Sequence, residues 1–162
     1  MSKESDYYQP IQITFDNMFR EKGSLYSEIT ANGQPSNKIK EQISDNRNII
    51  FSFLREARPD ITGFTVSDYS NKFFVIEIKN EEIKLDHIYQ TRKYIDLFDA
   101  YFGFLVTTKE IPAEIKKITD IDYGILDIGQ YRQFSICQYD EEHKIIVDWH
   151  KENPFEKDYY WK

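Results

Sequence analysis

The chain has 162 residues, of which 40% are hydrophobic, 30% are charged and 26 are aromatic, so a folded domain is expected rather than a disordered chain. The longest apolar run, from Phe73 to Ile76, is far shorter than the ~20 residues of a membrane helix, so we expect no membrane partner. The net charge of −7 argues against a protein that coats nucleic acid by bulk attraction, and the single cysteine, Cys137, favours a reducing cytoplasm.

The N-terminal part of the chain is expected to be helical. Apolar residues recur at near-helical spacing over residues 11–29, with Gly23 as a weak point. Ser36 is placed to cap a short helix that runs to about residue 45. The apolar stretch 48–54 then predicts a first strand.

The rest of the chain alternates strands and helices. Asp86 is expected to cap the longer of two helices, which runs to about Ala100. Strands are expected at 60–66 and 72–79, with a turn at 68–71 between them. Two further strands are expected at 101–107 and 123–128, with a short helix over 112–119 between them. A final hairpin is expected from residues 131–139 and 144–149.

This order predicts an α/β fold, a mixed β-sheet flanked by helices. We expect a single domain over residues 1–162. Its core would span about 36–128, with an N-terminal helical extension (1–35) and a C-terminal hairpin and tail (129–162).

The strand that ends in Glu77 and Lys79 carries the chemical signal. Its apolar residues fall on both alternating faces, which is typical of a central, covered strand, so charged groups at its end need a partner. If Ser67 faces Lys72 across the turn, Asp60 lies opposite Lys79, and all three charged groups project from one face. Two carboxylates beside a lysine suit a divalent cation, whereas a simple ion pair at a strand end is the plainer interpretation.

These residues resemble a known family. Arg58-Pro59-Asp60, a hairpin and then Glu77-Ile78-Lys79 are similar to the PD-(D/E)xK (restriction-endonuclease-like) nuclease superfamily, and Gln90 to Tyr94 resembles its Q-x-x-x-Y element. The order is most like the N-terminal nuclease domain of type I restriction motor subunits. The resemblance covers roughly residues 36–119, and no G-x-x-x-x-G-K phosphate loop follows for a motor.

The resemblance implies a role for each matching residue. Asp60 and Glu77 would bind Mg²⁺ or Mn²⁺ together with the backbone carbonyl of Ile78, and Lys79 would position the attacking water or stabilise charge on the phosphate. Further catalytic residues would be Gln90 and Tyr94, one turn apart on a helix, and a glutamate from the first helix, for which Glu41 is preferred and Glu28 is the competitor.

The function expected from these residues is a metal-dependent endonuclease that hydrolyses DNA phosphodiester bonds in the cytoplasm. RNA stays open as a substrate, and so does assembly as a homodimer or with a partner subunit. The alternative is the same fold kept as a catalytically inactive binding or assembly module.

Other chemistry-bearing residues receive plainer interpretations. We expect all three histidines at the surface, Cys137 buried in a hairpin strand, and the aromatic C-terminal tail packed against the same domain or a partner rather than stacked on bases.

Overall fold

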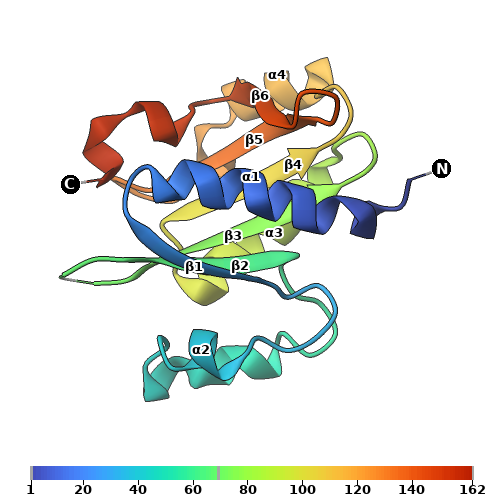
Figure 1. Ribbon diagram of the computed structural model, residues 1–162. Coiled ribbons are helices and arrows are strands. Elements are labelled where there is room, and N and C mark those ends of the chain that lie inside the picture. Colours follow the sequence, from blue (N-terminus) through green and yellow to red (C-terminus); the bar gives the residue numbers. More distant parts are fainter. Residues whose placement is uncertain (1, 69, 162) are drawn as a thin grey trace.

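The computed structural model describes residues 2–68 and 70–161. It is a mixed α/β structure whose six strands form one sheet in the order β1-β2-β3-β4-β5-β6, flanked by helices (Figure 1). The strands are β1 (Ser24–Ile29), β2 (Ile61–Val66), β3 (Lys72–Lys79), β4 (Phe102–Thr107), β5 (Gln133–Asp140) and β6 (Ile145–His150). The first three strands pair antiparallel, β3, β4 and β5 are parallel, and β6 is antiparallel to β5.

Within the described residues, four α-helices and five short 3₁₀ helices lie between or beside these strands. The α-helices are α1 (Tyr8–Arg20), α2 (Asn37–Lys40), α3 (Leu85–Phe98) and α4 (Ala113–Ile121). The 3₁₀ helices are η1 (Glu4–Tyr7), η2 (Asp45–Ser52), η3 (Tyr123–Ile125), η4 (Pro154–Glu156) and η5 (Asp158–Trp161).

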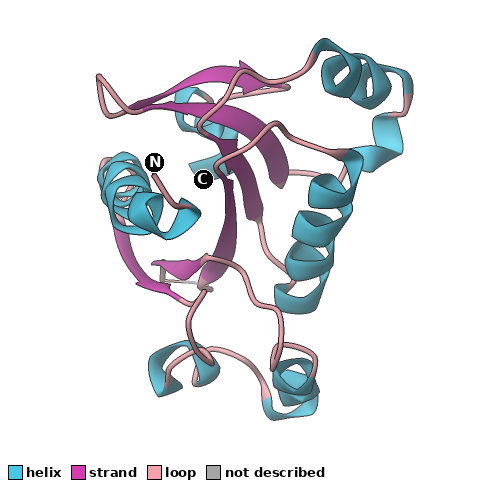
Figure 2. Ribbon diagram, turned by 90° about the vertical axis from the view of Figure 1, so that its right-hand side faces the viewer, coloured by secondary structure: helices cyan, strands magenta, loops and turns pink. Residues whose placement is uncertain are grey.

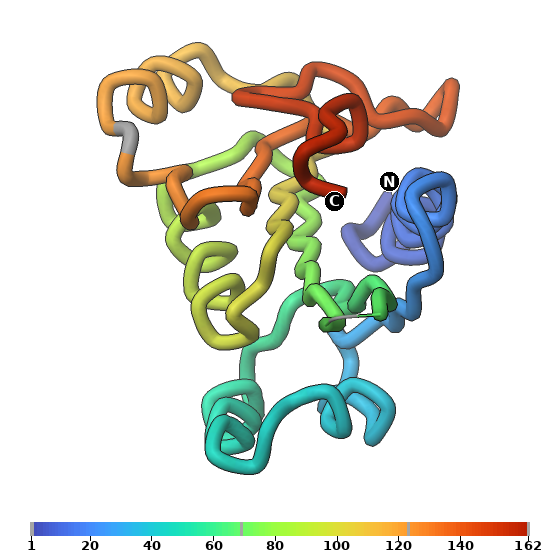
Figure 3. The backbone as a smooth tube through the Cα atoms, turned by 90° about the vertical axis from the view of Figure 1, so that its left-hand side faces the viewer, coloured from blue at the N-terminus to red at the C-terminus, as the bar shows by residue number. Residues whose placement is uncertain are grey.

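Helix α1 covers one face of the sheet. Its Phe19 stacks on Phe74 of β3 with ring centroids 4.1 Å apart, and its Phe15 contacts Phe104 of β4. The C-terminal tail packs beside α1 on this face, where Phe155 and Trp161 contact Phe19 (Figure 3). The expected packing of the aromatic tail is therefore confirmed.

Helix α3 covers the opposite face (Figure 2). It connects β3 to the parallel strand β4 and covers the face of these strands that α1 leaves open. Ile95 and Phe98 of α3 belong to the same buried cluster as Val75 of β3 and Leu105 of β4. The strand that ends in Glu77 and Lys79 is therefore central and covered on both sides.

The expected helix over 11–29 is only half correct. Helix α1 ends at Arg20, Gly23 has a positive φ of 156°, and residues 24–29 form the edge strand β1. Gly23 reverses the chain direction, and β1 then gains its hydrogen bonds from β2. The periodicity over 24–29 also fits a strand, which short apolar segments do not distinguish from a helix.

Two expected strands are wrong. Residues 48–52 lie in the 3₁₀ helix η2, where Ile50 is buried, and of the two residues that follow Phe53 is 66% exposed and Leu54 is buried. Residues four apart share a face in a helix and in a strand alike, so this short apolar stretch does not distinguish the two. Residues 123–128 contain the 3₁₀ helix η3, stabilised at its start by the Asp122 side chain, which accepts a hydrogen bond from the Gly124 N–H.

The remaining elements agree with expectation within a few residues. Strands β2 to β6 and helices α3 and α4 lie where the pattern predicts them. Ser36 does precede α2, but that helix ends at Lys40 instead of residue 45, and α3 starts at Leu85, before Asp86. Within residues 2–68 and 70–161, no helix combines the length and apolarity that a membrane span needs.

Candidate functional site

Asp60 lies immediately before β2, at the end of the sheet where β3 finishes. In the β2–β3 register Ile78 comes opposite Pro59, whose nitrogen has no hydrogen to donate. The Asp60 carboxylate fills part of this gap, because its Oδ2 accepts a hydrogen bond of 2.7 Å from the Ile78 N–H. The Pro59 carbonyl accepts from the Thr30 hydroxyl instead. The backbone of two strands thus fixes the orientation of Asp60.

The pairing of β2 with β3 is shifted by two residues from the expected pairing. Thr65, rather than Ser67, faces Lys72, because the loop between the strands is longer than a four-residue turn. Extended to the strand ends, this pairing puts Asp60 opposite Glu77. An even shift leaves every side chain on its original face, so the two carboxylates still converge.

Glu77 and Lys79 project from the same face at the end of β3. Glu77 is 3% exposed, and its Oε1 lies 3.5 Å from Lys79 Nζ. Its Oε2 is buried and has no hydrogen-bond partner among the residues described. A buried carboxylate oxygen without a partner is costly, so this position favours an additional positively charged group.

The two carboxyl groups influence each other strongly. Burial raises the pKa of Asp60 to about 6, although the hydrogen bond from Ile78 acts in the opposite direction. Burial and the negative charge of Asp60 raise the pKa of Glu77 well above its usual range. Both carboxyls therefore keep their protons to a higher pH than exposed carboxyls do.

Helix α3 contributes the two other expected residues. Gln90 Nε2 donates a hydrogen bond of 3.3 Å to the Tyr94 hydroxyl, as their spacing of four residues suggests. Tyr94 is buried, and its pKa is raised mainly by burial and further by the charges of Glu77 and Asp60. Tyr94 therefore faces the acidic pair, while Gln90 is half-buried beside it.

Neither expected glutamate contacts the acidic pair. Glu41 is exposed at the end of α2 and makes no ion pair or hydrogen bond with Asp60 or Glu77. Glu28 accepts hydrogen bonds from the Tyr26 hydroxyl (2.8 Å) and the Ser36 N–H (3.0 Å), and so shapes the chain before α2.

Two residues near the pair are absent from the sequence-based set. Glu4 in η1 raises the pKa of both Asp60 and Glu77 by its negative charge. Tyr8, the first residue of α1, lies beside Asp60, and burial followed by the Asp60 charge raises the pKa of its phenol. No motif marks these residues, because their position depends on how α1 packs across the sheet.

The histidine expectation is also partly wrong. His143 is exposed as expected, but the His87 ring is buried at the start of α3, where its Nδ1 accepts from the Lys84 N–H at 3.0 Å. His150 is half-buried and bonds to Thr119. Cys137 is buried as expected.

The residues present can accommodate a hard divalent cation. The available oxygens are the Asp60 carboxylate, the unpartnered Oε2 of Glu77 and the Ile78 carbonyl, which leaves its strand on the same side as its N–H, toward Pro59. Among the described residues, however, no group of three or more His, Cys, Asp and Glu side chains is arranged around one metal position. The fit therefore rests on two carboxylates and a backbone oxygen.

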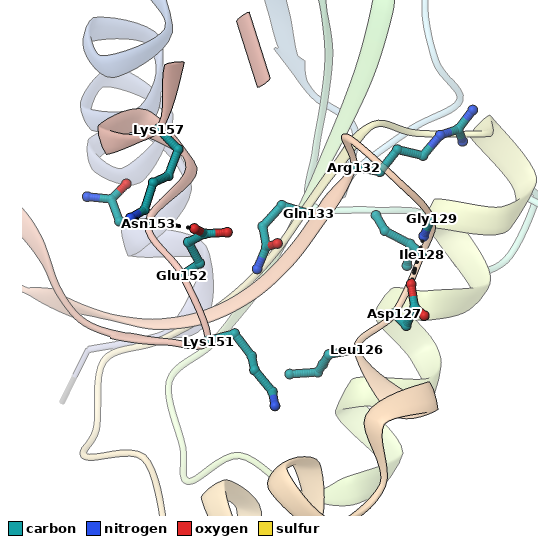
Figure 4. A pocket seen from close by; sticks show the side chains of 10 residues that line it. All are labelled: Leu126, Asp127, Ile128, Gly129, Arg132, Gln133, Lys151, Glu152, Asn153 and Lys157. Atoms are coloured by element: carbon teal, nitrogen blue, oxygen red, sulfur yellow. Dashed lines mark hydrogen bonds and ion pairs between the residues drawn. The ribbon is translucent and has the colours of Figure 1, made fainter. Parts of the chain in front are cut away.

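A cavity also lies away from the acidic pair. It has a volume of about 670 Å³ and sits near the start of β5, at the opposite end of the sheet from Glu77 (Figure 4). Its charged groups already have partners: Arg132 pairs with Asp99, Lys151 with Asp120, and Glu152 accepts from two tyrosine hydroxyls. These charged groups are paired, unlike the Oε2 oxygen of Glu77.

The comparisons with known proteins add no relative. No protein-family model, no curated protein and no solved structure matches the chain.

Proposed function

We propose that the chain is a metal-dependent endonuclease that hydrolyses DNA phosphodiester bonds, with the restriction-endonuclease-like fold of the PD-(D/E)xK superfamily. The order of elements supports the proposal: an acidic residue before β2, a hairpin into β3 with Glu-x-Lys at its end, then α3 and a parallel β4. The buried Cys137 fits the cytoplasmic location that we also propose.

One observation carries the proposal. Two carboxyl groups are buried within reach of each other at the end of a central strand, and one of their oxygens has no partner. When both carboxyls are ionised, the buried pair of like charges is strongly unfavourable, and Lys79 alone balances only one of them. A divalent cation would neutralise the pair, so the arrangement is better explained by metal binding than by stability.

Each residue would have a defined role in hydrolysis. Asp60, Glu77 and the Ile78 carbonyl would hold Mg²⁺ or Mn²⁺, which supplies a more acidic water and positive charge near the phosphate when bound. Lys79 would stabilise the negative charge that develops on the phosphate. Tyr94, with Gln90 beside it, would orient Glu77 or the sugar-phosphate backbone.

A second candidate function is a non-catalytic binding or assembly module, as a homodimer or with a partner subunit. The near-complete burial of the acidic pair and the net charge of −7 favour it. Such a module would retain the fold without cutting.

A nuclease assay separates these functions. Purified protein is incubated with supercoiled plasmid, single-stranded DNA and RNA, each with Mg²⁺, Mn²⁺ or a chelator. We expect metal-dependent cleavage of DNA that Asp60→Asn abolishes. The matched control is Asp16→Asn, because Asp16 on α1 is also a partly buried carboxyl with a raised pKa but bonds to Ser27. Cleavage that persists in Asp60→Asn, or its absence with every substrate and metal, would contradict the proposal.

A further inference from the structure

The acidic pair is closed to solvent. Asp60 and Glu77 are 5% and 3% exposed. A phosphodiester, which is bulkier than a water molecule, therefore cannot reach the pair unless part of the surrounding structure moves.

The N-terminal residues 2–6, termed here the N-terminal cover, lie at this end of the sheet. Figure 1 shows the first turn of the chain beside the end of β3, and η1 contacts that strand. The Asn80 Nδ2, just beyond β3, donates a hydrogen bond of 2.9 Å to the Ser2 carbonyl. Glu4 of the cover is half-buried and close enough to raise the pKa of both members of the pair.

The N-terminal cover is held much less firmly than the chain that follows. The Lys3 N–H bonds to the Asp6 side chain and the Asp6 N–H to the Lys3 carbonyl, so these hydrogen bonds lie within the cover. By contrast, Tyr7 is buried, stacks edge-on against Tyr139 and donates to Glu141. A segment with few contacts to the body opens at low free-energy cost. Tyr7 can thus stay anchored while residues 2–6 move.

The N-terminal cover also brings a negative charge close to the acidic pair. Glu4 makes no ion pair or hydrogen bond through its side chain within the described chain. Its carboxylate would stand close to an incoming phosphate and repel it. The charge of Glu4 in the cover therefore opposes the approach of substrate to the pair.

Building on the proposed function, we infer that residues 2–6 are an autoinhibitory cover that must lift before a cation and a phosphodiester reach Asp60 and Glu77. The cover closes through the Ser2–Asn80 contact and pivots at Tyr7. Its position then sets how fast the site is loaded.

A reversible lock tests this inference. The double variant Ser2→Cys, Asn80→Cys joins the cover to the body by a disulfide, and the buried Cys137 does not interfere. Tb³⁺ is the probe, because its luminescence is sensitised by nearby tyrosines such as Tyr8 and Tyr94. We expect oxidised protein to take up Tb³⁺ and cut DNA at least roughly tenfold more slowly than wild type, with recovery to at least the wild-type rate after reduction, because Asn80→Cys also removes the hydrogen bond to Ser2.

A variant lacking residues 2–6 gives the converse result. Because one hydrogen bond, from Asn80, joins the cover to the end of β3 within the described residues, removal of the cover should speed Tb³⁺ uptake by roughly fivefold. Thermal melting checks that the fold survives. Equal uptake by locked, reduced and shortened proteins would overturn the inference.

The two hypotheses fail in different ways. If no form binds Tb³⁺, the proposed metal site is wrong, and the cover is then judged by hydrogen exchange of the Ile78 N–H, which bonds to Asp60. Removal of residues 2–6 must accelerate that exchange, and an unchanged rate would refute the cover as well.

Discussion

Lys79 is the residue at which the structural and catalytic interpretations differ most clearly. It pairs with Glu77 at 3.5 Å, and its side chain is 14% exposed. As an ion-pair partner it would stabilise the fold, whereas as a catalytic group it would act only on the phosphate. The raised pKa of Glu77 separates these roles, because Glu77 can take up a proton if the lysine is removed.

We therefore predict that Lys79→Ala leaves the domain folded but reduces cleavage by about 10²–10³-fold, the usual cost of losing one such electrostatic contact. Calorimetry with Mn²⁺ should still detect binding, and circular dichroism should show the wild-type fold. Lys109→Ala is the control, since Lys109 is an exposed lysine in the loop after β4. Unfolding of Lys79→Ala would instead favour the ion-pair interpretation.

The raised pKa of Asp60 predicts how the free energy of unfolding depends on pH. Its pKa rises from 3.8 to about 6 in the folded chain, so the folded state binds the proton more tightly than the unfolded state. Its contribution to stability is fully present below about pH 4 and is lost as the pH rises through 6. At 1.4 kcal/mol per pKa unit, the loss approaches roughly 3 kcal/mol by pH 8.

Asp60→Asn should accordingly raise the free energy of unfolding at pH 8, by up to roughly 3 kcal/mol, and have little effect at pH 4. The amide oxygen of asparagine can still accept from Ile78. Urea unfolding at both pH values measures the difference, and Asp86→Asn, an exposed residue of α3, controls for surface charge. A destabilised Asp60→Asn at pH 8 would mean that the ionised carboxylate supports the fold.

At the scale of elements, the local sequence predicted the alternation of strand β3 but not the β2–β3 register, which depends on the length of the loop between the two strands. Strand β3 was predicted with its observed bounds because both faces are apolar, and that placed Glu77 and Lys79 correctly relative to each other. Strand β1 was not predicted, because its hydrogen bonds come from β2 rather than from its own residues. Glu4 and Tyr8 were missed for a related reason, since only the packing of α1 brings them to the end of β3.

Gly63 shows how closely α1 and the first strands are packed together. A Cβ at this position in β2 would come within 2.5 Å of the Tyr26 carbonyl of β1 and would collide with the Phe74 ring, on which Phe19 stacks. Gly63→Ala should lower the free energy of unfolding by about 1–3 kcal/mol through this overpacking. Chemical denaturation measures the change, and Gly33→Ala, which meets no atom within 4 Å, should be neutral. An equally stable Gly63→Ala would mean that β1 is loosely attached.

For the molecule as a whole, charge opposes the proposed substrate. The loops that follow β3, β4 and the turn after β5 all lie at the end of the sheet that holds the acidic pair. They carry five carboxylates (Glu81, Glu82, Glu110, Glu141, Glu142) against three lysines (Lys84, Lys109, Lys144). Duplex DNA is densely negative, so this surface lowers its affinity unless cations intervene.

The position of that charge should matter more than its total. Glu82→Lys with Glu142→Lys changes the net charge from −7 to −3 at the site end, and Glu21→Lys with Glu156→Lys makes the same change at the other end. All four side chains are exposed.

If DNA approaches the acidic pair, the first variant should bind and cut DNA more strongly at low salt, and two new phosphate contacts would steepen its salt dependence by about 2 in log–log slope. The second variant should show little of either change, because its lysines lie about the length of a strand, roughly 20 Å, from the pair. Fluorescence anisotropy with duplex DNA across a salt series distinguishes the two. Equal gains in both variants would show that DNA responds only to bulk charge, and the proposed approach to Asp60 and Glu77 would be wrong.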